Sequence, residues 1–408
     1  MIFIQPFIYN AAQPAIVQIE NVKSNRYITS SQKPNNLDIK RNNNLRTKHI
    51  IVFLKLFTNA KNKVFDRALP KKKWDVVYDG LNQSEPVHIK GMKNVLIKNS
   101  TFKNIENSHA IKIEDSDNIR IENVAIEHLS GKRNLSGVGI NDSTNVTVKG
   151  SIISKIFSSG QSAGIKIIGA RSANITIDDN HIYNTYGNGI VSDGSSNNAA
   201  TQTVHDTPVP GLKIINNSIH DTGKTPTPRS NSPTHGMYIK AQDAYIANNT
   251  VYNSFDGTGI SLRSTATVVN NRVWDTKLSA VGFLQMKPAG PSMKSTFENN
   301  ELFYTENRPK GTSPLLGLNW QGEEDNYPLR YDDFTIRNNK FSICTEVVNR
   351  SPIIKLYPFN NLTIANNDLV DRRKNTRFFS YHAEPPIRYE NDKSMNSFNQ
   401  IDCITDTR

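Results

Sequence analysis

The sequence predicts an all-β fold in which short strands wind into a three-sheet parallel β-helix of about ten coils. Three observations lead to this fold class: an internal repeat of Asn-led segments, period-two alternation of apolar residues, and short regular spacings. The shortest spacings, from Asn249 to Asn271 and from Asn99 to Asn123, are 22 and 24 residues. A helical solenoid would need apolar residues three and four positions apart, which these segments lack.

The first repeated segment is an Asn followed by alternating apolar residues. It begins at Asn99, Asn123, Asn180, Asn217, Asn249, Asn271, Asn300, Asn339 and Asn367. From Asn217 onward the preceding residue is also Asn. Side-chain amides stacked on successive coils can hydrogen-bond turn backbone that would otherwise be buried and unpaired. We therefore expect a ladder of asparagines along one corner of the coils.

Two further repeated segments supply the other strands of each coil. One is a small residue followed by apolar and variable residues in alternation, starting at Ala110, Gly164, Gly189, Gly236 and Gly259. The other precedes the Asn-led segment and starts at Asn118, Asn145 and Asn174. Their β-branched residues fall on the inward positions of short strands. Three strands a coil are therefore expected.

Composition and charge narrow the classes of partner. The 408 residues are 36% hydrophobic and 21% charged, and 49 basic against 37 acidic side chains give a net charge of +12. This favours an anionic partner, and we expect an acidic polysaccharide because the basic residues form no nucleic-acid-binding module. No segment is long and apolar enough to span a membrane. No oligomeric state follows, and pairing of Cys344 with Cys403 stays open.

The repeat divides the chain into three regions. Residues 1–85 lack the repeat and include an expected amphipathic helix around 50–68; we interpret them as an N-terminal cap that covers open strand edges. Residues 86–371 form the β-helix, and residues 372–408 form a tail that packs on the coils. The first residues lack the features of a signal peptide. We nevertheless expect a secreted, cell-surface or periplasmic protein.

Insertions gather around one strand of the coil, the strand that begins with a small residue. They span residues 194–210, 223–234, 288–295, 305–313 and 321–330. Functional residues concentrate where a rigid scaffold meets long loops. We therefore expect these segments to wall a groove across one sheet, where a polymer can lie. The alternative is that they are tolerated decoration.

Alignment of the coils on the small residue stacks chemically active side chains on that sheet. Asp193, Lys240 and Arg263 fall in one outward column, and Lys166, Tyr238 and His235 lie beside it. The candidate catalytic residues are Lys240, Arg263, His235 and Tyr238, and the candidate substrate-binding residues are Lys166, Asp193, Asp256, Asn188 and Trp320. The alternative interpretation is a set of ordinary surface ion pairs, which contribute at most about 1 kcal/mol.

These residue types suit proton abstraction next to a uronate carboxylate. Such a reaction needs a base and a cation that neutralises the developing enolate. Lys240, crowded by Arg263, is one candidate base, and Tyr238 can protonate the leaving oxygen. His235 is the alternative base, since its unperturbed pKa lies near neutrality. The competing interpretation of His235 is a histidine that caps the preceding turn.

The run from Val87 to Val370 resembles the right-handed parallel β-helix of the pectin-lyase-like superfamily. Within it, segments 239–241, 247–250, 259–263 and 269–271 resemble the catalytic stretch of polysaccharide lyase family 6, the alginate and chondroitin lyases. The resemblance implies a lysine base at Lys240 and a partner arginine at Arg263. The carboxylates that bind calcium in that family are not matched, because Pro233, Thr234 and His235 occupy their place. We therefore expect no metal or other cofactor, with calcium as the alternative.

A second stripe of side chains follows the Asn column. Aromatic residues recur three positions after each Asn, at Tyr183, His220, Tyr252, Trp274 and Phe303. If they point outward, they either bind sugar rings or pack beneath the terminal segment, because large exposed apolar patches mark a contact.

Together these features predict an enzyme that cleaves a uronate-containing polysaccharide by β-elimination. The alternatives on the same fold are a glycoside hydrolase, a carbon-5 epimerase and a non-enzymatic, tailspike-like glycan-binding protein. Hydrolysis would need two carboxylates about 5–9 Å apart. The candidate pairs are Asp193 with Asp256 and Glu114 with Asp142.

Overall fold

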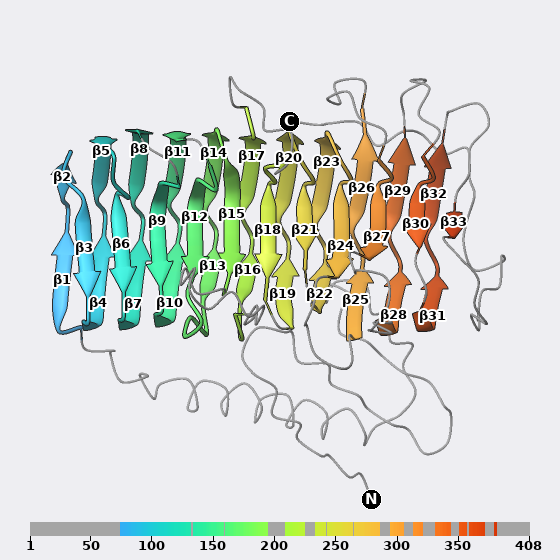
Figure 1. Ribbon diagram of the computed structural model, residues 1–408, viewed down its shortest axis with the longest axis horizontal. Coiled ribbons are helices and arrows are strands. Elements are labelled where there is room, and N and C mark those ends of the chain that lie inside the picture. Colours follow the sequence, from blue (N-terminus) through green and yellow to red (C-terminus); the bar gives the residue numbers. More distant parts are fainter. Residues whose placement is uncertain are drawn as a thin grey trace, which may run out of the picture. The chain divides into compact units, whose positions relative to one another are not determined.

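The structure is a computed structural model that describes residues 74–131, 134–158, 160–194, 209–224, 233–241, 243–263, 265–285, 294–305, 313–320, 331–343, 351–356, 359–371 and 379–381. Every element in these residues is a strand, and no helix that could cross a membrane occurs among them. The strands form three parallel sheets of eleven strands each, and every third strand along the chain joins the same sheet (Figure 1). The predicted three-sheet parallel β-helix is confirmed.

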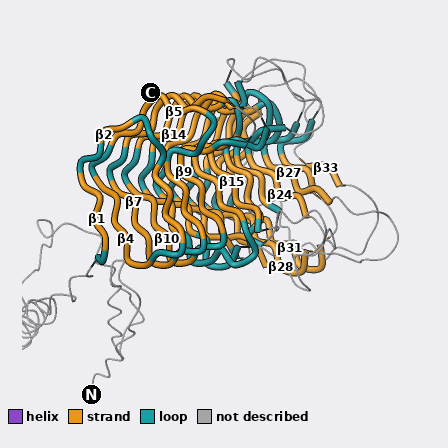
Figure 2. The backbone as a smooth tube through the Cα atoms, turned by 60° about the vertical axis from the view of Figure 1, so that its left-hand side comes forward, coloured by secondary structure: helices purple, strands orange, loops and turns teal. Residues whose placement is uncertain are grey.

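Each coil contributes one strand to each sheet, and we name the sheets A, B and C in the order in which the chain visits them (Figure 2). Sheet A consists of β1 (Val76–Asp79), β4 (Lys93–Lys98), β7 (Asp117–Glu122), β10 (Thr144–Lys149), β13 (Thr176–Asp178), β16 (Lys213–Ile215), β19 (Ala244–Ala247), β22 (Ala266–Val269), β25 (Lys294–Glu298), β28 (Tyr331–Arg337) and β31 (Phe359–Ala365). Sheet B consists of β2 (Asn82–Gln83), β5 (Thr101–Glu106), β8 (Ala125–Gly131), β11 (Ile152–Ser158), β14 (His181–Thr185), β17 (Ser218–Thr222), β20 (Thr250–Ser254), β23 (Arg272–Thr276), β26 (Glu301–Tyr304), β29 (Lys340–Ile343) and β32 (Asp368–Asp371). Sheet C consists of β3 (Val87–Lys90), β6 (Ile111–Glu114), β9 (Ser136–Asn141), β12 (Ala163–Ile168), β15 (Asn188–Asp193), β18 (Met237–Lys240), β21 (Ile260–Leu262), β24 (Val281–Gln285), β27 (Leu316–Trp320), β30 (Ile354–Leu356) and β33 (Phe379–Tyr381).

The β-helix begins before, and ends after, the boundaries expected from the sequence. Strands β1 and β2 already belong to the first coil, so the β-helix begins at Val76, before residue 86. Strand β33 adds a segment of the expected tail to sheet C. The remainder of the tail, the cap residues 1–73, and both cysteines lie outside the described residues.

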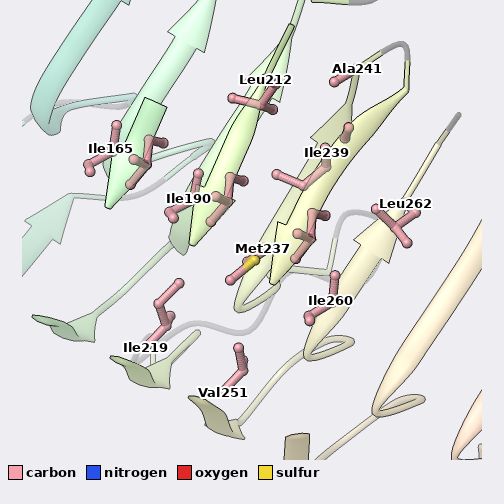
Figure 3. Close-up of a cluster of buried hydrophobic side chains, with 14 of the residues drawn as sticks. Ile165, Ile190, Leu212, Ile219, Met237, Ile239, Ala241, Val251, Ile260 and Leu262 are labelled. Carbon is pink, nitrogen blue, oxygen red and sulfur yellow. The ribbon is translucent and has the colours of Figure 1, made fainter. Parts of the chain in front are cut away.

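The core consists of inward-facing aliphatic side chains in register from coil to coil. In sheet C, Ile165 aligns with Ile190, Ile190 with Met237, and Met237 with Ile260. These four side chains line one row of the interior and are fully buried (Figure 3). Because successive residues of a strand point to opposite faces, the residues between them face outward. The core thereby fixes which side chains sheet C presents on its outer face.

The expected asparagine ladder occupies the turn between sheets A and B. From Asn180 to Asn339 each buried Asn donates its backbone N–H to the Oδ1 of the next Asn, as between Asn249 and Asn271 at 2.9 Å, and Asn367 is the last acceptor. Its Nδ2 donates to a carbonyl oxygen of the coil before, such as Ile246 O at 2.9 Å from Asn271. The amides therefore satisfy turn backbone that the core would otherwise leave unpaired.

Backbone conformation explains why the residue before most ladder asparagines is also Asn. The residue before each ladder Asn has a positive φ, as at Asn216, Asn248 and Asn270 with 60°, 57° and 57°. Asn tolerates this left-handed region better than other non-glycine residues. Asn99 and Asn123, with φ of 50° and 53°, occupy this preceding place. Their assignment to the ladder column was wrong by one residue, because in these first coils the ladder position is held by Ser100 and Val124.

Glycine recurs where sheet B turns into sheet C because two coils approach closely there. A Cβ added to Gly236 would lie 2.6 Å from the carbonyl oxygen of Gly259 and 2.6 Å from Cγ1 of Val251. Gly189 and Gly259 are equally crowded by the next coil. The small residue that opens the sheet C segment is thus required by packing.

Candidate functional site

The candidate site lies on the outer face of sheet C, on the strands β12, β15, β18 and β21. Register pairs Lys166 with Val191 and Val191 with Tyr238 in one outward column. The neighbouring column pairs Asp193 with Lys240, and Arg263 follows directly after β21. Adjacent coils are about 4.8 Å apart. The column expected for Asp193, Lys240 and Arg263, with Lys166 and Tyr238 beside it, is the arrangement in the structure.

Lys240 and Asp193 form an ion pair that is largely shielded from solvent. Nζ of Lys240 lies 3.3 Å and 3.4 Å from the two carboxylate oxygens of Asp193. Their side chains are only 13% and 15% exposed. A nearby carboxylate stabilises the charged form of an amine. The pair therefore places a carboxylate directly beside the Lys240 amine.

Tyr238 lies among the cationic groups of the site. The guanidinium carbon of Arg263 lies 4.9 Å from the centroid of the Tyr238 ring, and Nζ of Lys240 lies 5.9 Å from it. Both distances are within the range of cation–π attraction. The backbone N–H of Arg263 donates to the carbonyl oxygen of Ile239 at 2.8 Å, which continues the ladder of sheet C past the end of β21. The phenol is thus flanked by two positive charges.

The titration of Lys166 is perturbed by its surroundings. Although it points outward from sheet C, it is only 8% exposed. Burial lowers the pKa of its ammonium, and the carboxylate of Asp193 acts in the opposite direction. A lysine with a lowered pKa is a candidate general base. The sequence pattern placed Lys166 in the site but gave no sign of its burial.

His235 and Asn188 belong to a column that ties each coil to the next at the start of sheet C. Nδ1 of His235 accepts the backbone N–H of Thr258 at 3.0 Å, and Oδ1 of Asn188 accepts the backbone N–H of His235 at 2.7 Å. His109 makes the equivalent bond to Ser136 at 3.0 Å. The bond to Thr258 leaves the His235 proton on Nε2.

The environment of His235 suits this structural role. The residue is 3% exposed, and burial, followed by the charge of Arg263, lowers its pKa to about 3. A neutral imidazole with Nδ1 engaged and Nε2 protonated has no free lone pair with which to abstract a proton. This geometry favours a lysine over His235 as the base. Asn188 has a structural role too, because its side chain stabilises the turn that contains His235.

Asp256 and Trp320 stand apart from the two columns. Asp256 lies in the turn before β21, where it accepts a hydrogen bond from Nζ of Lys277 at 3.1 Å and from the backbone N–H of Thr234 at 3.2 Å. Trp320 ends β27, with its backbone paired to Gln285. Its side chain lies outside the described residues.

The carboxylates proposed for hydrolysis are engaged in other interactions. Glu114 contacts Lys112 at 2.7 Å and His88 at 2.6 Å, and the hydrogen bond from Lys112 is the main cause of its lowered pKa. Asp142 accepts the backbone N–H of Arg171 at 3.1 Å. A hydrolytic general acid needs a carboxyl whose pKa is raised. The surroundings of Glu114 have the opposite effect.

No group of three or more His, Cys, Asp or Glu within the described ranges is arranged to hold a metal ion. The stretch before Lys240 supplies Pro233, Thr234 and His235, none of which offers the carboxylate oxygens that calcium prefers. These residues do not fit a calcium site.

The insertions that were expected to wall a groove lie next to strands of sheet C in the sequence. Residues 195–208 follow β15, 225–232 precede β18, 286–293 follow β24, 306–312 precede β27 and 321–330 follow β27. All five segments lie outside the described residues, so the predicted groove stays a prediction.

The aromatic stripe lies on the outer face of sheet B and forms one continuous stack. Ring centroids are 5.3 Å apart from Tyr183 to His220, 4.6 Å to Tyr252, 4.4 Å to Trp274 and 5.3 Å to Phe303, with planes within 9° of parallel. The ring faces therefore contact one another. A sugar binds an aromatic residue through its face, so this packing argues against the sugar-binding alternative.

Comparison with known proteins finds a matching family model and several similar solved structures. The family model described as the right handed beta helix region matches residues 85–225. The A-module of mannuronan C-5 epimerase AlgE4 from Azotobacter vinelandii is 11% identical with a TM-score of 0.44, and the match covers 78% of this chain and 91% of that one. The surface adhesin PfbA of Streptococcus pneumoniae is 12% identical with a TM-score of 0.48, covering 75% and 79%.

A family 28 exopolygalacturonase of Yersinia enterocolitica is 12% identical with a TM-score of 0.48, and the match covers 77% of this chain and 63% of that one. No curated protein matches the sequence.

Proposed function

We propose that this right-handed parallel β-helix acts on an acidic, uronate-containing polysaccharide at the outer face of sheet C, by β-elimination. One observation carries the proposal: Lys166, Asp193, Tyr238, Lys240 and Arg263 converge there from successive coils, largely shielded from water. Shielding strengthens the attraction between these cations and a bound carboxylate. The net charge of +12 assists the approach of such a polyanion.

Lys240 and Arg263 bind and neutralise the uronate carboxylate in this scheme. Asp193 contacts Lys240 at 3.3 Å and 3.4 Å, an arrangement that favours the charged form of an amine. Arg263 supplies a planar guanidinium whose geometry matches a carboxylate in a bidentate contact. Positive charge at the carboxylate stabilises the enolate that forms when the neighbouring carbon loses its proton.

Lys166 is the better candidate for the base than Lys240. Proton abstraction needs an uncharged amine, and burial favours that form at Lys166. The ion pair with Asp193 favours the charged form at Lys240. We therefore assign proton abstraction to Lys166 and carboxylate binding to Lys240, a reversal of the role that the sequence resemblance implied for Lys240.

Tyr238 completes the reaction as the acid. The amine of Lys166 takes the proton from carbon 5, and the released electron pair forms the carbon 4–carbon 5 double bond. The bond from carbon 4 to the glycosidic oxygen breaks, and the Tyr238 hydroxyl protonates that oxygen. Lys166 and Tyr238 flank Val191 in their column, so base and acid lie on opposite sides of one position.

The test is a panel of alginate, chondroitin, pectate and hyaluronan incubated with the full-length protein. β-Elimination produces an unsaturated uronate, which is detected by its ultraviolet absorbance, and this product is the expected result with at least one polymer. New reducing ends without that absorbance would indicate hydrolysis. Inversion at carbon 5 without chain cleavage would indicate an epimerase. Binding without any chemical change would indicate a glycan-binding protein. Each of these three outcomes would overturn the elimination proposal.

A further inference from the structure

Two histidines on the outer face of sheet B meet through their Nε2 atoms. His181 of β14 and His220 of β17 lie on adjacent coils, and their Nε2 atoms are 2.8 Å apart. His181 is exposed, whereas the side chain of His220 is 13% exposed. This pair is on a different sheet from the candidate site and takes no part in the proposed reaction.

A carboxylate orients the inner histidine. Nδ1 of His220 lies 2.8 Å from Oδ2 of Asp221, and Oδ1 of the same carboxylate accepts a hydrogen bond from Nδ2 of Asn253 at 3.1 Å. When Nδ1–H donates to Asp221, the lone pair of His220 is on Nε2 and faces His181. A carboxylate behind a histidine is the usual outer support of an imidazole that binds a metal.

The aromatic stack holds His220 in place. Its ring lies between Tyr183 and Tyr252, at centroid distances of 5.3 Å and 4.6 Å and nearly parallel to both. Sandwiched in this way, the ring keeps its Nε2 edge directed along the face of the sheet. His181 is exposed, so its ring can rotate to adjust the angle between the two nitrogen atoms.

The spacing of the nitrogens selects a coordination geometry. Metal–nitrogen bonds of about 2.0–2.1 Å at a right angle place two ligand nitrogens roughly 2.9 Å apart, and a tetrahedral angle places them roughly 3.3 Å apart. The observed 2.8 Å is close to the right-angle value, but the ring centroids are 5.0 Å apart and the two rings meet nearly end to end, so the His181 ring must turn before both nitrogens face one ion. Right angles are typical of square-planar and tetragonal sites with nitrogen ligands, which favour Cu²⁺ and Ni²⁺.

We propose that His181 and His220 form a two-imidazole binding site for a divalent transition-metal ion of the Cu²⁺ or Ni²⁺ class, with Asp221 as the outer support of His220. The pair supplies two adjacent ligands, and water completes the coordination on the exposed side of the sheet. Such an ion bridges two coils of sheet B.

The experiment titrates Cu²⁺ alone into the full-length protein and follows binding by calorimetry and electron paramagnetic resonance. One tight equivalent, with hyperfine splitting from two imidazole nitrogens, is the expected result. His181→Gln should weaken this binding at least tenfold and leave one nitrogen, and His220→Gln should do the same. Asp221→Asn keeps both ligands and should weaken binding roughly 10- to 100-fold, as loss of an outer carboxylate does.

His88→Gln is the matched control, because His88 is another histidine on an outer sheet face beside a carboxylate, Glu114. It should leave the tight equivalent unchanged. Two-nitrogen splitting that persists in His181→Gln, or no saturable equivalent in the parent protein, would show that the pair is only hydrogen-bonded. If His220→Gln does not fold, His181→Gln still decides the question, since His181 is exposed and its loss leaves the core intact.

Discussion

Replacement of Asn271 by Ala tests the physical account of the coil corner. Asn271 is 1% exposed, and its Nδ2 donates to Ile246 O at 2.9 Å and to Val269 O at 3.0 Å. Its Oδ1 accepts the backbone N–H and the Nδ2 of Asn249, both at 2.9 Å. Alanine removes all of these partners and adds none.

The magnitude follows from the backbone group that the substitution leaves unpaired. The N–H of Asn249 lies at a buried corner that water does not reach freely, whereas the carbonyl of Ile246 keeps its bond in the ladder between β19 and β22. A buried polar group left unpaired costs roughly 1–3 kcal/mol, and we expect a loss of that size in the free energy of unfolding. The loss should be seen as a lower urea midpoint by circular dichroism.

Asn141→Ala provides the control because it makes the same change of side chain at an outward position of sheet C. It should alter stability by no more than about 0.5 kcal/mol, as surface substitutions do. If Asn271→Ala lowered the free energy of unfolding no more than Asn141→Ala does, the asparagine ladder would contribute nothing to the stability of the coils, and the account would be refuted.

Two further predictions concern the turn into sheet C. Burial lowers the pKa of His109 to about 4 and that of His235 to about 3, from 6.5. Between these values and pH 6.5 the unfolded chain binds more protons than the folded chain. The contribution of the two neutral histidines to the free energy of unfolding is therefore fully present above pH 6.5 and is lost as the pH falls towards 3. Urea midpoints measured at several pH values should follow this dependence. His235→Asn should make the dependence shallower, because an amide oxygen can accept the same backbone hydrogen bond without titrating, as Asn188 does one coil earlier. An unchanged pH dependence in this variant would contradict the view that His235 is buried in its neutral form. Gly236→Ala places a Cβ 2.6 Å from Gly259 O and should cost about 1–3 kcal/mol by overcrowding; a melting temperature equal to that of the parent would refute the close approach.

The fold was predictable because its repeats constrain every coil in the same way. Alternation of apolar residues gave the inward rows, and the small residues marked the crowded turn into sheet C. The column of asparagines was predictable from Asn180 onward, where the amide is needed for buried backbone. It was misassigned at Asn99 and Asn123, because Asn is also favoured at the preceding left-handed position, and composition alone does not separate these two causes.

The site was predictable as far as register determines it. Alignment of coils placed Asp193, Lys240 and Arg263 in one column because that column depends only on counting residues from the strand start. The burial of Lys166 was not predictable, since it depends on what covers an outward position. The role of His235 was also undecided, because a histidine in a turn and a catalytic histidine have the same sequence pattern.

The most direct test of the proposed site is the initial rate of unsaturated-uronate formation by Lys166→Ala, compared with Lys112→Ala. Lys112 lies in the same outward column two coils away, where it is 38% exposed and paired with Glu114. The account predicts that Lys166→Ala loses at least a hundredfold in rate, the usual contribution of a general base, while Lys112→Ala retains most of it. Equal rates in the two variants, with both proteins folded, would contradict the assignment of the base and of the site on sheet C.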